Sequence, residues 1–369
     1  MTIATTVNST NIQSQGRKPR GVVLVNNTVI PWESFEVDQN NFYVADKFRV
    51  EILINSLPKG INASYFGSSE SLDVQIYSGF PSNPDQYSKS NLTELIEGNV
   101  DDVDYEPFKG KIILSGRNFI SYFLDTKTSE TFGEQFSSDV VSLLATRHGL
   151  TPVVTPTSTL ISTFYNNVHY TLTKERTEWD ILTFLAKQEN YDIFVIGKKL
   201  YFQPKASTSG PVYAIICNLS QPLPSTNVID IAFSRNLTLA SDVVVKIQSW
   251  NLADQKSYIK TATAKHIKTS NAGNPINYQY TIPNLTPQQA SEMALNLAKE
   301  ISSHELRLKA VMPGDVTMTP QSIVQVAGTQ SIYDQQYFPS SILHRMSAEE
   351  GYVMTIEAKN NSGINLATV

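Results

Sequence analysis

The sequence predicts a mainly β protein of the α+β class, in which a small α/β insert separates two β-rich halves. Hydrophobic residues alternate with polar ones in the first and last parts of the chain, as in strands with one buried face. Helical spacing replaces this alternation soon after residue 116. With 369 residues, of which 41% are hydrophobic and 17% charged, the chain can bury a core in each of two or three domains.

Residues 21–117 are expected to form the first β domain, a barrel or a sandwich, after a flexible N-terminal arm over residues 1–20. Asn26 and Asn27 stand between two β-branched runs, which indicates a hairpin turn. The strongest alternation occurs in three stretches, KFRVEILIN, SLDVQIY and GKIILSGR.

Residues 118–225 are expected to contain the α/β insert and a linker. The stretch FSSDVVSLLATRHGL has an apolar stripe at helical spacing. Ser137 or Ser138 could cap the start of this helix, and Gly149 could end it.

A second helix of the insert is predicted after Thr177, because Thr177 and Asp180 have the spacing of a capping box. The stretch NYDIFVIGKKLYFQP then alternates on both sides of Gly197 and Lys198. This pattern predicts a hairpin that turns at these two residues.

Residues 226–361 are expected to form the second β domain with one embedded helix over 286–304, and residues 362–369 a C-terminal tail. Thr286 and Gln289 have capping-box spacing, and a proline occupies the first turn between them. Strand alternation is expected in SDVVVKIQSW, KSYIKTATA, HELRLKAVM, QSIVQV, SSILHRM and GYVMTIEAK.

Composition argues against several kinds of function. The net charge of −5 leaves no basic footprint for nucleic acid, so we expect no specific nucleic-acid binding. No apolar run is long enough for a membrane span, and we expect no membrane insertion. Cys217 is the single cysteine, which excludes an internal disulfide. The histidines lack metal-ligand spacing, so neither a metal nor a cofactor is expected: His148, His169, His266, His304 and His344.

An acidic cluster and the aromatic residues are the patterns closest to enzyme or sugar chemistry. Asp101, Asp102, Asp104 and Glu106 fall within six residues, but Pro107 stands where a calcium loop needs glycine. A solvated face explains the cluster better than a carboxylate pair. Three tryptophans and seventeen tyrosines could line a sugar groove, although such residues more often fill barrels or subunit contacts.

The stretch ILSGRNFISYFLDT lies where β alternation gives way to helical spacing. Gly116 could adopt a positive φ and end a strand, and Arg117 could pair with a carboxylate. No base or nucleophile stands nearby, so we expect a structural joint between domains rather than a catalytic site. Its residues are Gly116, Arg117 and Asp125.

Several motifs in order resemble the phage late control protein D family, the baseplate hub proteins of contractile-tailed phages. They are GKIILSGRN, FLDT, FSSDVVSLLATRHGL, TEWDILTFLAKQENYDIFVIGKKLYF, TPQQASEMALNLAKEI, PGDVTMTPQSIVQVAG and YFPSSILHRMSAEEGYVMTIEAK. The resemblance covers residues 95–360. Asn118 replaces the aspartate that is usual in this family, so we expect an Asn118→Asp change to be tolerated.

The resemblance implies two tail-tube-like β-barrel domains per chain and a structural protein rather than an enzyme. It implies a homotrimeric ring with pseudo-sixfold symmetry that joins the hexameric tail tube to the trimeric central spike. DNA or tape-measure protein would pass through the ring, and baseplate wedge proteins would contact it. The expected location is the tail baseplate of a virion, assembled in the host cytoplasm. A tail-associated peptidoglycan hydrolase and a carbohydrate-binding adhesin remain the alternatives.

Overall fold

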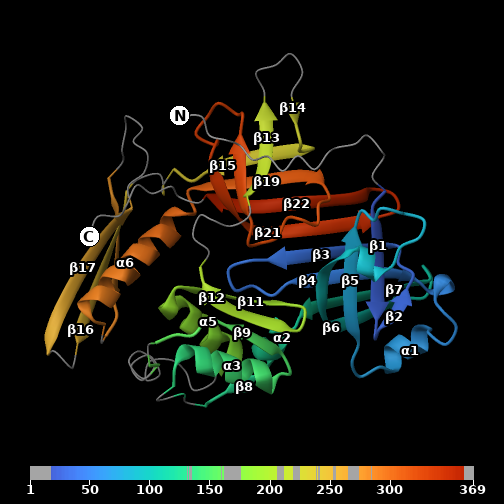
Figure 1. Cartoon of the computed structure of the whole chain (residues 1–369), viewed down its shortest axis with the longest axis horizontal. Coiled ribbons are helices and arrows are strands. Elements are labelled where there is room, and N and C mark those ends of the chain that lie inside the picture. The colour runs from blue at the N-terminus through green and yellow to red at the C-terminus, as the bar shows by residue number, and fades with distance from the viewer. Residues whose placement is uncertain are drawn as a thin grey trace.

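The protein is described here from a computed structural model (Figure 1). The structure describes residues 18–130, 132, 135–158, 160–161, 176–205, 212–218, 225–237, 239, 242–251, 255–264, 274–283 and 285–360. Most of the expected N-terminal arm and all of the expected C-terminal tail lie outside these residues. A large sheet of 14 strands dominates the fold, which confirms the mainly β class.

The first β half forms one end of the large sheet, in the order β3-β4-β7-β6-β5-β1-β2, and all of its pairs are antiparallel. Asn26 and Asn27 have φ values of 46° and 62°, which confirms the predicted hairpin turn. The strands are β1 (Arg20–Val25), β2 (Thr28–Ile30), β3 (Ser34–Asn40), β4 (Lys47–Leu53), β5 (Asp73–Gly79), β6 (Thr93–Glu106) and β7 (Lys111–Asn118). Short helical segments connect them: η1 (Ile54–Ser56), α1 (Ala63–Ser68) and η2 (Lys89–Asn91).

The second β half continues the same sheet, because β21 pairs antiparallel with β3 from Ser341↔Asn40 to Ser347↔Ser34. Its strands are β13 (Val212–Asn218), β14 (Ser225–Thr226), β15 (Asp230–Arg235), β19 (Leu306–Pro313), β20 (Ile323–Ala327), β21 (Gln336–Ser347) and β22 (Gly351–Asn360). Strand β13 was expected within the insert region, but it pairs in parallel with β20 and belongs to this half. Each half has its own apolar core.

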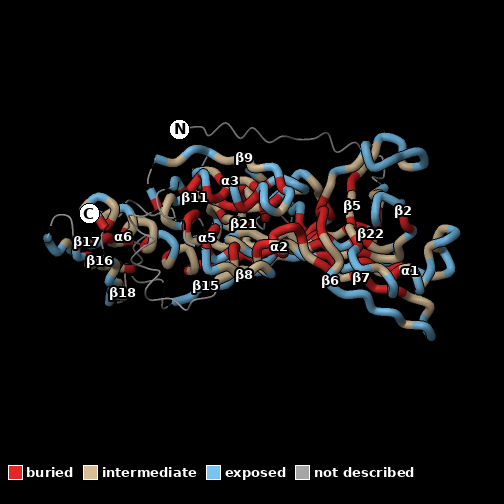
Figure 2. The backbone as a smooth tube through the Cα atoms, turned by 90° about the horizontal axis from the view of Figure 1, so that it is seen from below, coloured by how far each residue is buried: buried red, intermediate tan, exposed pale blue. Residues whose placement is uncertain are grey.

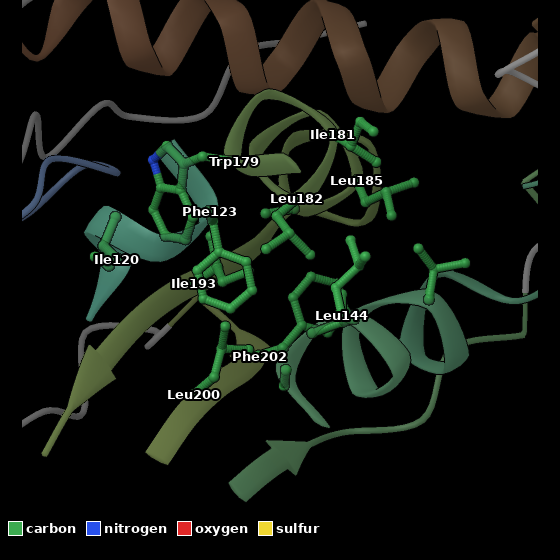
Figure 3. Close-up of a cluster of buried hydrophobic side chains, with 14 of the residues drawn as sticks. Ile120, Phe123, Leu144, Trp179, Ile181, Leu182, Leu185, Ile193, Leu200 and Phe202 are labelled. Carbon is green, nitrogen blue, oxygen red and sulfur yellow. The ribbon is translucent and has the colours of Figure 1, made fainter. Parts of the chain in front are cut away.

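The α/β insert packs three helices against a small sheet in the order β11-β12-β9 (Figure 3). Its elements are α2 (Ile120–Asp125), β8 (Lys127–Thr128), α3 (Ser137–Arg147), β9 (Thr151–Val154), β10 (Arg176–Thr177), α5 (Glu178–Glu189), β11 (Tyr191–Ile196) and β12 (Lys199–Pro204). Side chains from α2, α3, α5, β11 and β12 meet in one buried cluster, among them Phe123, Leu144, Leu182 and Phe202. The predicted hairpin is confirmed, since Gly197 at its turn has a φ of 51°.

Capping residues were predicted correctly for two of the three long helices in the part of the chain that the structure describes. The Thr177 hydroxyl accepts from the backbone N–H of Asp180, and Thr286 does the same with Gln289, so both capping boxes are present. The prediction for α3 was wrong, because Phe136 is its N-cap and no side chain caps it. Ser137 and Ser138 lie inside the first turn. Gly149 follows α3 with a φ of 72°, as expected of the residue that ends a helix.

A fourth unit consists of a three-stranded sheet in the order β17-β16-β18 with helix α6 packed on one face. Its elements are β16 (Val243–Asn251), β17 (Lys256–Ala264), β18 (Ile276–Thr281) and α6 (Pro287–Ser302). Its core contains residues of these elements and the adjoining Leu285, and Figure 1 shows it at one end of the molecule. The expected single domain over 226–361 with helix 286–304 embedded in it therefore differs from the observed packing.

Buried residues lie mainly in the sheets and the insert, and exposed residues lie mainly in the hairpin ends and loops (Figure 2). None of the helices in the described part of the chain is long and apolar enough to cross a membrane.

Candidate functional site

Gly116 lies inside β7, where it pairs with Phe48 of β4 and Val100 of β6. The prediction of a positive φ at this glycine was wrong. A Cβ atom here would lie 2.0 Å from the carbonyl oxygen of Asn99 and 2.6 Å from Cζ of Phe48. Glycine is needed because neighbouring strands approach too closely for any side chain, in a region where β6 carries a bulge.

Arg117 joins two strands and a helix through two carboxylates. Its Nε and Nη2 donate to the two carboxylate oxygens of Asp101 on β6 at 2.6 Å and 2.9 Å. Its Nη2 also donates to Oδ2 of Asp125 at 2.9 Å, at the end of α2. The hydrogen bonds to Asp101, and next those to Asp125, raise the pKa of Arg117 above its usual value. The predicted pairing of Arg117 with a carboxylate is therefore present, and Asp125 is one of its two partners.

Asn118 ends β7 and is hydrogen-bonded to a buried carboxyl group. Its Nδ2 donates to Oδ2 of Asp46 at 2.9 Å, and its backbone N–H donates to the carbonyl of Asp46 at 3.0 Å. The other oxygen, Oδ1 of Asp46, accepts from the backbone N–H of Asn40 at 2.6 Å. Burial raises the pKa of Asp46 to about 7. An aspartate at position 118 would face this carboxyl group directly, so the expected tolerance of Asn118→Asp does not follow from the structure.

The loop of residues 41–46, which we call the joint loop, connects β3 to β4 and reaches into the insert. The Tyr43 hydroxyl donates to the carbonyl of Tyr191 at 3.1 Å, and Nε1 of Trp179 donates to the carbonyl of Tyr43 at 2.9 Å. Ala45 is part of the buried cluster of the insert. The first β half thus contributes a loop to the core of the insert.

The joint loop also contacts the second β half. Nδ2 of Asn41 donates to the carbonyl of Pro320 at 2.8 Å, and Nζ of Lys359 lies 3.5 Å from the centre of the Phe42 ring. Phe42 and Tyr43 have φ values of 55° and 70°, a region that bulky residues rarely occupy. Such strain persists only where surrounding contacts hold it. The joint loop therefore fixes three units together. Sequence reasoning missed it, since no glycine marks the turn.

The residues of the acidic cluster all lie on one strand, β6. Asp102, Asp104 and Glu106 follow one another along the outer half of β6, where Asp102 and Asp104 are exposed. Asp101 is engaged by Arg117. Within the described residues, His, Cys, Asp and Glu side chains form no group of three that could hold a metal ion.

Two of the described histidines, His148 and His344, are held by structural contacts. Nε2 of His148 lies 2.5 Å from Oε2 of Glu178, which is fully buried. Nδ1 of His344 lies 2.8 Å from the hydroxyl of Tyr352, and burial lowers the pKa of His344 to about 4. His169 and His266 lie outside the described residues.

Several solved structures share this fold. A tail protein from Neisseria meningitidis MC58 matches with a TM-score of 0.66 and 13% identity, over 93% of this chain and 97% of that one. The 43 kDa tail protein of prophage MuSo2 from Shewanella oneidensis matches with a TM-score of 0.60 and 13% identity, over 93% and 97%. An Escherichia coli component of the type VI secretion system matches with a TM-score of 0.52 and 8% identity, over 94% and 79%. That protein is structurally similar to the T4 bacteriophage tail proteins gp27 and gp5.

No protein-family model matches the sequence, and no curated protein matches it either. The solved structures place the chain in a class, the proteins with a phage tail protein fold. The expected resemblance to phage tail proteins is confirmed at the level of the fold, which the chain also shares with a type VI secretion component.

Proposed function

We propose that the chain is the structural hub of a contractile phage tail baseplate and has no enzymatic activity of its own. The observation that carries the proposal is the shared fold with tail proteins over 93% of the chain. A further matching protein, structurally similar to the T4 tail proteins gp27 and gp5, supports a place among tail components, and the hub role follows from the family resemblance of the sequence motifs.

In the proposed assembly, three copies form a ring in which the two β halves of each chain act as two tail-tube-like barrels. Three chains with two β units each would present six similar surfaces, which suits a hexameric tail tube. The ring as a whole would have threefold symmetry, which suits a trimeric central spike. The two halves are suited to this task because β3 and β21 join them into one sheet. A rigid link keeps both units in a fixed relation.

The joint of Gly116, Arg117 and Asp125, together with the joint loop, would hold the insert against this sheet. Its groups are engaged in packing and hydrogen bonds, as a structural role requires. Baseplate wedge and tape-measure proteins would be further partners, and the location would be the tail baseplate of a virion assembled in the host cytoplasm.

Electron microscopy of the purified full chain, alone and with the tail tube and central spike proteins of the same particle, tests the proposal. Threefold rings with a central hole that bind both partners are expected. A chain that remains monomeric at micromolar concentration and binds neither partner would overturn it. A zymogram and a glycan array address the hydrolase and adhesin alternatives, and the hub should be inactive in both.

A further inference from the structure

Part of strand β6 has an unpaired edge. Pairing of β6 with β5 ends at Asn99, and from Asp101 to Glu106 the strand pairs only with β7 within the described chain. Asp102 and Asp104 on this stretch are exposed and make no ion pair with other described residues. An unpaired edge of this length is a ready template for a strand of another molecule.

The same stretch also carries an apolar face that the described residues leave partly exposed. Val103 and Tyr105 pair directly with Leu114 and Ile112, which are fully buried, so all four side chains lie on the core side of the sheet. Val103 and Tyr105 nevertheless remain 36% and 53% exposed, and Phe108 at the hairpin end is completely exposed. The apolar face of this sheet therefore extends past the described residues that cover its core.

Strand β17 is an edge strand of its sheet within the described residues, and it carries lysines rather than carboxylates. It pairs only with β16 within the described residues, from Lys256 to Ala264. Lys256 and Lys260 fall on one face of the strand, and Ile259, which is 54% exposed, falls on the other. A shallow groove between this edge and α6 is lined by Lys260, Leu295 and also Glu292, so one carboxylate lies in the groove with the lysine.

The two edges have the same alternation of charged and apolar residues, and their charges are opposite. On β6, acidic residues occupy positions 102, 104 and 106, and apolar residues occupy positions 103 and 105. If β17 lay antiparallel beside β6, its lysines would face the carboxylates and Ile259 would cover Val103 and Tyr105. Figure 1 shows the unit of β16, β17 and α6 at one end of the molecule, and β6 and β7 toward the other.

We propose that the edge of β6 over residues 101–106 docks onto the edge of β17 in a second copy of this chain. A contact between two different surfaces at opposite ends is head-to-tail, and such contacts close into rings when the rotation between copies permits. The inference rests on the proposed function, because it names the contact that would close the hub ring.

Charge reversal in the full chain tests this contact. We expect Asp102→Lys with Asp104→Lys, and separately Lys256→Glu with Lys260→Glu, to weaken ring assembly about tenfold or more in sedimentation experiments. All four changes in one chain restore the attraction and should restore assembly. Glu349→Lys with Glu350→Lys, in the exposed turn between β21 and β22, makes the same change of net charge as the Asp102 and Asp104 variant and should leave assembly unchanged.

Zero-length carbodiimide crosslinking of the unmodified protein is the second readout. We expect links between the peptide that contains Asp104 and the peptides that contain Lys256 or Lys260. Rings that form but show neither these links nor any response to charge reversal would overturn the inference and leave the proposed hub intact. The absence of rings at micromolar concentration would overturn both.

Discussion

The side-chain amide of Asn118 donates a 2.9 Å hydrogen bond to the carboxyl group of Asp46, where the first β half meets the α/β insert. Removal of either partner leaves a buried polar group without its bond, at a cost of about 1–3 kcal/mol. Position 118 at the end of β7 therefore needs a side chain that can donate a hydrogen bond to Asp46.

An exchange of the two residues tests this constraint. Asn118→Asp should lower the free energy of unfolding by about 1–3 kcal/mol at pH 8, because two carboxyl groups would then face each other. Adding Asp46→Asn should recover most of the loss, since the pair again holds one amide and one carboxyl group. Urea unfolding of both single variants and the double variant gives the coupling energy. Equal stability of Asn118→Asp and the unmodified protein at pH 8 would contradict the geometry.

The pKa of Asp46 predicts a pH dependence of stability. Burial raises this pKa from 3.8 to about 7, so the folded state binds the proton more tightly than the unfolded chain. The contribution of Asp46 is greatest below about pH 4 and declines as the pH rises to about 7, by at most about 1.4 kcal/mol per pH unit. Asp46→Asn should flatten the measured dependence between pH 5 and pH 7. An unchanged slope in this variant would show that Asp46 does not cause it.

Gly116 is predicted to tolerate no side chain. Gly116→Val should abolish folding or cost several kcal/mol, because its Cβ would meet the backbone of β6 at 2.0 Å. Gly67→Ala, in helix α1, is the matched control. No atom lies within 4 Å of the Cβ position there, and alanine favours helix. Thermal unfolding should show a large loss for the first variant and none for the second.

The ion pairs of Arg117 should stiffen the connection between β7 and α2. Arg117→Lys keeps the charge but loses the two-pronged contact with Asp101, and we expect a loss of about 1 kcal/mol. Hydrogen exchange over α2 should become faster, and more so at low salt than at high salt, where the original pairs are already screened. Arg345→Lys, whose pair with Glu36 is exposed, serves as the control. Equal effects of both variants on α2 would argue against a joint.

The joint loop should couple the insert to the sheet. Tyr43→Ala removes the hydroxyl contact to Tyr191 and part of the packing against the insert. We expect two separate unfolding transitions in place of one, with the fluorescence of Trp179 following the insert. Trp32 and Trp250 are replaced by Phe in the reference protein and in the Tyr43→Ala variant, so that all tryptophan fluorescence comes from Trp179. A single unchanged transition would show that the loop does not couple the units.

Much of the local structure follows from the sequence because the relevant interactions span only a few residues. Strand alternation, the hairpin turn at Asn26 and the capping boxes at Thr177 and Thr286 could all be recognised from adjacent positions. The prediction for Ser137 failed because a distant residue decided it: its hydroxyl donates to Glu189 at 2.7 Å instead of capping α3.

The tertiary structure alone decided how these elements combine. The pairing of β3 with β21 joins residues about three hundred positions apart, and nothing in either strand specifies its partner. The same holds for Gly116, where the approach of β6 excludes a side chain, and for the contacts that hold Phe42 and Tyr43 in a strained conformation. The sequence by itself determined the β class, the positions of the helices α3, α5 and α6, and the resemblance to phage tail proteins. Packing between distant segments determined the joint, because burial and backbone approach are properties of the assembled chain.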